Sequence, residues 1–235
     1  MLKADLHIHT NYIQKGEGKY SPKWLIDHMA KWGYEVLAIT EHSTLNGAFV
    51  KKSYSNALDT YFKFKDYAKE KNILLIPGVE RHIEGVEVLI LNYNNFEEIN
   101  TFKDLQKVRQ KGGLIIAPHP YYPWGLNGKL EENIKYFDAL ERTVHYLKGF
   151  DSLNEKAEEI AKKYKKTMVA NSDAHWKFQL NRNATLIDAE KNIDSILDAI
   201  RKNKVEIQTK PLTTKQYFFT TMWVIKSKIR KLFTV

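Results

Sequence analysis

The chain alternates between short runs rich in apolar residues and longer segments in which apolar residues recur every three or four positions. Such short runs are typical of buried strands, and the longer spacing is typical of helices with one apolar face. The short runs predict strands at Ala4–Ile8, Val36–Ile39, Ile73–Ile76, Val86–Leu91, Leu114–Ala117, Phe137–Leu140 and Met168–Ala170.

The longer segments predict helices at 21–31, 56–71, 96–111, 154–165 and 192–203. The first of them begins with Ser21-Pro22, a capping residue followed by a proline in the first turn, and Gly33 ends it. Strands that alternate with helices indicate βα units and a parallel sheet. About seven such units favour an α/β barrel over an open sheet.

Residues with metal-binding or acid–base side chains follow most of these strands. They are His7, His9, Glu41, His42, Glu80, His119, Glu141, Asp173 and His175. In an α/β barrel the carboxyl ends of the strands meet at one face, and the functional site is assembled there. Side chains that are far apart in the sequence are therefore expected to converge on that face.

The spacing of these residues narrows the chemistry. His7 and His9 stand two apart on a predicted strand, so both side chains project from the same side. One such pair by itself is also compatible with the polar edge of a core, although a functional role is the favoured interpretation. Asp173 and His175 repeat the spacing, and two pairs joined by Glu80 and His119 favour a metal site. Imidazole and carboxylate ligands suit zinc, manganese or iron.

The composition excludes several alternatives. The chain has no cysteine, which rules out disulfides, thiolate metal sites and cysteine nucleophiles. Any metal must be held by His, Asp and Glu, and any phosphatase chemistry needs a metal-bound water or a non-thiol nucleophile. No run approaches the roughly 18 apolar residues of a membrane span, and no secretory signal is visible. We therefore expect a cytoplasmic protein.

Five motifs in a fixed order resemble the PHP (polymerase and histidinol phosphatase) family. They are DLHIHT, ITEH, PGVE, APHP and NSDAH, and FDALE at 137–141 also fits the pattern. The resemblance implies a distorted, TIM-like (β/α)7 barrel, which we expect over residues 1–210. It also implies a phosphatase or phosphodiesterase in which divalent metals, one to three per chain, activate water against a phosphate ester. The expected substrate is a phosphorylated small molecule or a nucleotide.

The resemblance also implies the ligands. Transferred position by position, they are His7, His9, His42, Glu80, His119, Asp173 and His175. Glu80 would bridge two metals, and His7, His9 and Asp173 would complete the first site, whose water would attack phosphorus. His42 and His175 would serve the second site, with His175 also counted among the catalytic residues, and His119 would serve the third. Glu41 is expected to orient an imidazole.

Two positions depart from the family pattern. Gln14 stands in the segment where the family often has Asp or His, and Leu89 stands where it often has His. Glu17 and His82 are nearby replacements, but neither aligns. The alternative interpretation is therefore a catalytically degenerate barrel that binds a metal or nucleic acid, although the sequence contains no specific nucleic-acid-binding motif.

Two further features have open interpretations. Arg182 is a candidate for holding the substrate phosphate, or is a solvated loop residue. The aromatic segment 121–125 either stacks on a base or sugar of the substrate, or covers the barrel.

The C-terminal segment 211–235 carries much of the basic charge. Nearly all of the net charge of +9 arises after residue 200, where Glu206 is the only acid. Phe218, Met222, Ile225, Ile229 and Leu232 recur at helical spacing and predict a basic amphipathic helix. Its apolar stripe is expected either to pack on the barrel or on another subunit, or to lie on an anionic membrane. The sequence does not decide the oligomeric state.

Overall fold

The computed structural model describes residues 1–15, 17–46, 51–53, 55–123 and 125–233. The strands of its main sheet are β1 (Leu2–Ile8), β2 (Val36–His42), β5 (Leu74–Leu75), β6 (Gly78–Ile83), β7 (Val86–Leu91), β8 (Leu114–Ala117), β9 (Ala139–Arg142), β10 (Thr167–Ala170), β11 (Ala184–Ile187) and β12 (Val205–Gln208). The short strands β3 (Thr44–Asn46) and β4 (Lys51–Ser53) pair separately. The helices are α1 (Pro22–Lys31), α2 (Asp59–Glu70), α3 (Leu105–Gln110), α4 (Leu130–Asn133), α5 (Ser152–Lys163), α6 (Ile193–Arg201) and α7 (Thr214–Phe233).

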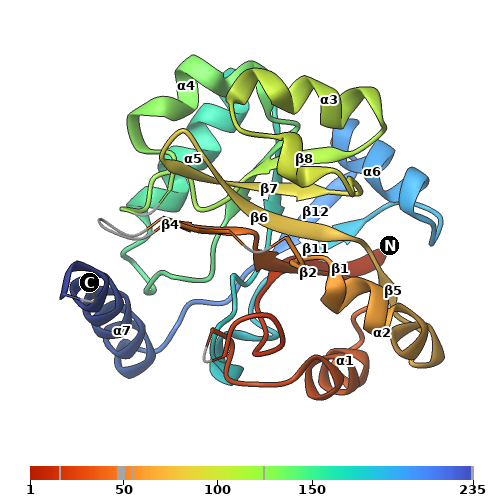
Figure 1. Cartoon of the computed structure of the whole chain (residues 1–235), viewed down its shortest axis with the longest axis horizontal. Coiled ribbons are helices and arrows are strands. Elements are labelled where there is room, and N and C mark those ends of the chain that lie inside the picture. The colour runs from red at the N-terminus through yellow and green to blue at the C-terminus, as the bar shows by residue number, and fades with distance from the viewer. Residues whose placement is uncertain (16, 47–50, 54, 124, 234–235) are drawn as a thin grey trace.

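The main sheet curls into a nearly closed barrel with helices around it (Figure 1). Its strand order is β10-β9-β8-β7-β6-β2-β1-β11-β12, with β5 beside β2. The two ends of this order meet, since β10 contacts both β11 and β12. The Thr185 hydroxyl joins them by accepting from the backbone N–H of Ala170 and donating to its carbonyl. The expected α/β barrel is confirmed.

The sheet is mixed, so the expectation of a wholly parallel sheet is wrong. Strands β1, β2 and β6 run parallel, as do β8, β9 and β10, but β7 is antiparallel to β6 and β8. The reversal follows from a tight turn at Glu84-Gly85, where both residues have positive φ (47° and 91°), as in the two-residue turns that suit hairpins. Sequence patterning missed β6 as a strand of its own because it carries Glu80, Arg81 and His82 among its apolar residues.

Two antiparallel strands, β11 and β12, also escaped prediction. β11 pairs with β1 on the side away from β2, and β12 pairs with β11. In β12 the half-buried Val205 and Ile207 alternate with the exposed Glu206 and Gln208, so the strand has no continuous apolar run. The predicted helix at 96–111 is likewise shorter than expected, because two 3-10 turns precede α3.

The barrel core is apolar, and the strand β1 is irregular near its carboxyl end. Leu6 packs with Leu89 in the barrel core, whereas Ile8 packs with Met29 of α1. The pairing of β1 with β2 changes register between Asp5 and Ile8, and such an irregularity redirects side chains. The polar residues at this end of β1 therefore lie above an apolar barrel floor.

Candidate metal centre

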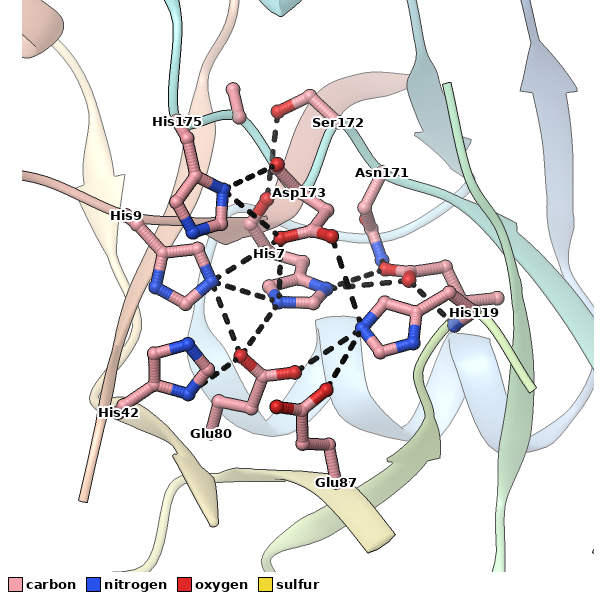
Figure 2. Close-up of polar contacts among 12 residues, drawn as sticks. His7, His9, His42, Glu80, Glu87, His119, Asn171, Ser172, Asp173 and His175 are labelled. Carbon is pink, nitrogen blue, oxygen red and sulfur yellow. Dashed lines mark hydrogen bonds and ion pairs between the residues drawn. The ribbon is translucent and has the colours of Figure 1, made fainter. Parts of the chain in front are cut away.

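Polar side chains gather at the end of the barrel where β1, β2, β9 and β10 finish (Figure 2). His7 and His42 come from the last residues of β1 and β2, and Asp173 and His175 follow β10. Because β7 runs in the opposite direction, its first residues lie at this same end and contribute Glu87. The structure brings together all seven ligands that the family resemblance implies.

The first group consists of His7, His9, Glu80 and Asp173, all from the expected first site. The Nε2 atoms of His7 and His9 are 3.1 Å apart, and they lie 3.4 and 3.2 Å from Glu80 Oε2. Asp173 Oδ1 lies 3.4 Å from the first Nε2 and 3.3 Å from the second. With metal–ligand bonds of about 2.0–2.2 Å, tetrahedral ligand atoms are separated by about 3.3–3.6 Å. The four atoms are spaced as metal ligands would be.

Glu80 has contacts on both sides of its carboxylate, as a bridging ligand would. Its Oε2 lies 3.1 Å from His42 Nδ1 in addition to the two contacts above, and its Oε1 lies 3.3 Å from His119 Nε2. The side chain is buried at the centre of the cluster (Figure 2).

The second group contains a carboxylate that the motif alignment did not supply. Glu17 Oε1 lies 3.2 Å from His175 Nε2 and 3.4 Å from His42 Nε2. Ligand atoms of Glu17, His42, His175 and His9 all lie within 4.8 Å of one another. Gln14 instead donates to the backbone carbonyl of His42, at 3.3 Å. The loop after β1 therefore places a carboxylate beside the two histidines.

The third group also gains a carboxylate. In the β6–β7 pairing Leu89 lies opposite Glu80, and its side chain fills the barrel core. Alternate residues of a strand share a face, so Glu87 faces the same interior two positions nearer the open end. Its Oε2 lies 3.7 Å from His119 Nε2. The departure at Leu89 thus leaves His119 with Glu80 and Glu87 as neighbours.

Glu141, to which the sequence assigned no role, orients two members of the cluster. It is fully buried, and His7 Nδ1 lies 3.0 Å from its Oε1. The backbone N–H of His119 donates to its Oε2 (2.9 Å), and the side-chain amide of Asn171 donates to its Oε1. A carboxylate on Nδ1 fixes the imidazole so that the Nε2 lone pair of His7 is directed at the cluster.

Glu41 does not orient an imidazole through any contact of the described residues. Its carboxylate accepts from the hydroxyl and backbone N–H of Thr10 and, at 3.3 Å, from the hydroxyl of Thr60. The expected role is therefore corrected: Glu41 holds the backbone immediately after His9. Burial raises the pKa of this carboxyl group.

The histidines and carboxylates of the cluster shift one another's pKa values. Burial alone would lower the pKa of His9, but its bonds to Asp173 and Glu80 outweigh burial and raise that pKa to about 10. Similarly, burial opposes but Glu80, Asp173 and Glu87 raise the pKa of His119 to about 9. Without a metal, protons on the imidazoles compensate the carboxylates. A divalent cation can replace those protons.

Part of the cluster lines a cavity of about 140 Å³: Glu17, His42, Glu80, Glu87, His119, Asp173 and His175. The remaining wall comes from Thr143, His145, Trp176 and Gln179, and from Thr220, Trp223 and Val224 of α7. Lysine and arginine are absent from the described lining. The donor set of imidazoles and carboxylates therefore fits divalent metal ions.

Arg182 lies outside the cavity lining, and Tyr122 of the aromatic segment is buried against the barrel. The Arg182 guanidinium donates to the carbonyls of Phe178 and Pro211 and to the side chain of Gln216, and it is not part of the cavity lining. Tyr122 is buried and donates to the carbonyl of His145, as expected of a residue that covers the barrel. Trp124 lies outside the described residues.

Comparison with known proteins agrees with this geometry. The family model for the PHP domain matches residues 5–210. The chain belongs to the PHP family. Two uncharacterized proteins of Methanocaldococcus jannaschii are similar to it. One is 32% identical over 134 residues, covering 52% of this chain and 70% of the relative, and the other is 28% identical over 227 residues, covering 90% and 82%.

Solved structures with the same fold share few residues with this PHP chain. A two-domain protein of Bacteroides vulgatus, which contains a predicted PHP-like metal-dependent phosphoesterase, has a TM-score of 0.68 at 19% identity and covers 93% of this chain and 68% of its own. PsfC from Pseudomonas syringae has a TM-score of 0.62 at 15% identity, covering 96% and 97%. These likenesses support the fold.

Proposed function

We propose that this PHP protein is a metal-dependent hydrolase that cleaves a phosphate ester. The observation that carries the proposal is a cluster of five imidazoles and four carboxylates, part of which lines a cavity whose described lining contains no lysine or arginine. Family membership supports a phosphoesterase kind of function.

In the proposed arrangement, His7, His9, Glu80 and Asp173 hold one ion. His42, His175 and Glu17 hold a second, and His119, Glu80 and Glu87 hold a third. When bound, divalent ions neutralise phosphate oxygens and lower the pKa of a coordinated water.

The protein's own residues prepare this chemistry by position. Glu141 holds His7 so that its Nε2 faces the cluster, and Glu41 fixes the strand end that carries His9. Lysine and arginine are absent from the described lining, so a bound divalent ion would supply the positive charge that attracts an anionic phosphate ester. Binding and turnover should therefore both require metal, and the cavity volume of about 140 Å³ favours small esters.

The test combines metal content with activity on one sample. Protein purified without chelators is analysed by inductively coupled plasma mass spectrometry and assayed with p-nitrophenyl phosphate and bis-p-nitrophenyl phosphate. We expect metal-dependent turnover, and the preferred ester will separate phosphatase from phosphodiesterase. His7→Ala or Asp173→Ala should lower the activity or the metal affinity by more than the roughly 10–100-fold loss that is typical when a group that only orients a ligand is removed.

His28→Ala is the matched control, because His28 lies on α1 and stacks on Trp24 outside the cluster. Full activity and metal content in both ligand variants would overturn the assignment. Absence of bound metal, with no turnover after addition of manganese, zinc or iron, would instead favour the degenerate binding barrel.

A further inference from the structure

Helix α7 lies on the barrel with its more polar face inward. The hydroxyls of Thr220 and Thr221 lie 3.2 and 3.3 Å from the two ring nitrogens of His145. The ring centroids of Trp223 and His175 are 5.2 Å apart, and Trp223 lines the cavity. The Arg182 guanidinium fixes the start of the helix through Pro211 and Gln216. One face of α7 is thus part of the site wall.

The opposite face of α7 exposes large apolar side chains. Phe218, Met222 and Ile225 are 60%, 50% and 44% exposed, whereas Phe219, at the border of this face, is 45% exposed and also contacts the rings of Trp176 and Phe178. The first three residues recur at helical spacing, so they form a single stripe, which Lys215 and Lys226 border with exposed side chains. Of the alternatives left open by the sequence, packing of Phe218, Met222 and Ile225 on the chain's own barrel is not what the structure shows, since all three are exposed. Contiguous exposed apolar surface of this kind commonly marks an interaction site.

The charge of the segment limits its possible partners. From residue 207 to the end the sequence contains Lys210, Lys215, Lys226, Lys228, Arg230 and Lys231 and no acid. A second copy docked through the same face would bring two such basic segments together, at an electrostatic cost. An anionic bilayer complements both the lysines and the apolar stripe, because amphipathic helices of this composition lie in the membrane interface. No helix among the described residues is long and apolar enough to cross a membrane.

We infer that α7 docks on an anionic membrane surface through Phe218, Met222 and Ile225. A helix with its side chains is about 10–12 Å across. Because the other face of α7 lines the cavity, docking holds the metal centre about that distance from the bilayer. Membrane binding of α7 does not depend on turnover at the metal centre.

The experiment is flotation of the full-length protein with vesicles of phosphatidylcholine alone or phosphatidylcholine mixed with phosphatidylglycerol. We expect binding to the mixed vesicles, weaker binding to phosphatidylcholine alone, and a decrease at high salt because screening weakens attraction to the lipid charges. The triple variant Phe218→Gln, Met222→Gln, Ile225→Gln keeps good helix formers and removes the apolar stripe. Its partition coefficient should fall about tenfold or more.

Phe62→Gln is the matched control, since Phe62 is 50% exposed on α2 and should leave binding unchanged. Thermal unfolding of each variant shows whether the fold is retained. Equal binding of the wild type and a folded triple variant would overturn the inference. Failure of the wild type to bind the mixed vesicles would also overturn it. If light scattering then found a dimer that the triple variant converts to a monomer, the stripe would instead be an interface between two copies of the chain.

Discussion

Glu17 and Glu87 lie beside the second and third groups of the cluster. In these groups the motifs lack one of the family's usual ligands, at Gln14 and at Leu89. Each glutamate lies near the expected position in sequence, yet neither aligns with it: Glu17 reaches His42 and His175 from a loop, and Glu87 reaches His119 from the start of an antiparallel strand. A glutamate can replace an imidazole as a metal ligand because both donate a lone pair at a similar bond length. The substitution also makes the cavity more negative.

Removal of either carboxylate should weaken one metal position selectively. We expect Glu17→Gln to reduce metal content at the His42 and His175 position, and Glu87→Gln at the His119 position, with affinity falling by about tenfold or more at each. Titration with manganese or zinc, followed by mass spectrometry of the retained metal, measures this. Glu132→Gln is the control, because Glu132 is exposed on α4. Metal content equal to the control in both variants would exclude Glu17 and Glu87 as ligands.

At the scale of the element, the packing of α7 depends on a neutral histidine. Burial lowers the pKa of His145 to about 4, with Asp173 opposing and His119 adding to the effect, and the ring is held by Thr220, Thr221 and the stacked Tyr217. An exposed histidine has a pKa of about 6.5. Release of α7 would therefore allow His145 to take up a proton between pH 6.5 and 4.

The sign of this effect predicts that α7 loosens on acidification. The stabilisation is fully present above about pH 6.5 and is lost progressively as the pH falls toward 4, by at most about 3 kcal/mol. Hydrogen exchange of the α7 amides, corrected for intrinsic rates, should show weaker protection at pH 5 than at pH 7.5. His145→Gln should reduce this difference. An unchanged pH dependence in that variant would assign the effect to other groups.

At the scale of the whole molecule, the barrel brings together carboxylates whose mutual repulsion needs a compensating positive charge, either from protons on the imidazoles or from a bound cation. Asp173 and Glu17 have pKa values well below their ordinary range; burial opposes this, and neighbouring histidines outweigh it. Protonated imidazoles can therefore balance the carboxylates near neutral pH, and the metal-free chain should remain folded. Bound metal adds stability by mass action.

Chelation should accordingly lower the unfolding temperature without abolishing the fold. For metal present at about a thousand times its dissociation constant, the loss is about 4 kcal/mol, or roughly 10 °C for a chain of this size. Calorimetry before and after treatment with a chelator measures it, and added manganese should restore the original transition. An identical transition in both states would indicate that the cluster holds no metal.

The sequence alone determined the fold class and predicted the principal candidate ligands, because both depend on local patterns. Apolar runs of strand length and the five motifs place His7, His9, His42 and Asp173 at strand ends whatever the details of pairing. Capping of α1 by Ser21 was predictable for the same reason, since the cap involves only neighbouring residues.

The tertiary structure decided which further groups enter the site. The direction of β7, which brings Glu87 to the open end, follows from pairing across the hairpin, and Glu141 meets His7 only through closure of the barrel. The orientation of α7 was also undetermined, because a helical stripe specifies which residues share a face and not what that face contacts. Long-range packing turned the stripe of Phe218, Met222 and Ile225 to solvent and Trp223 toward the metal centre.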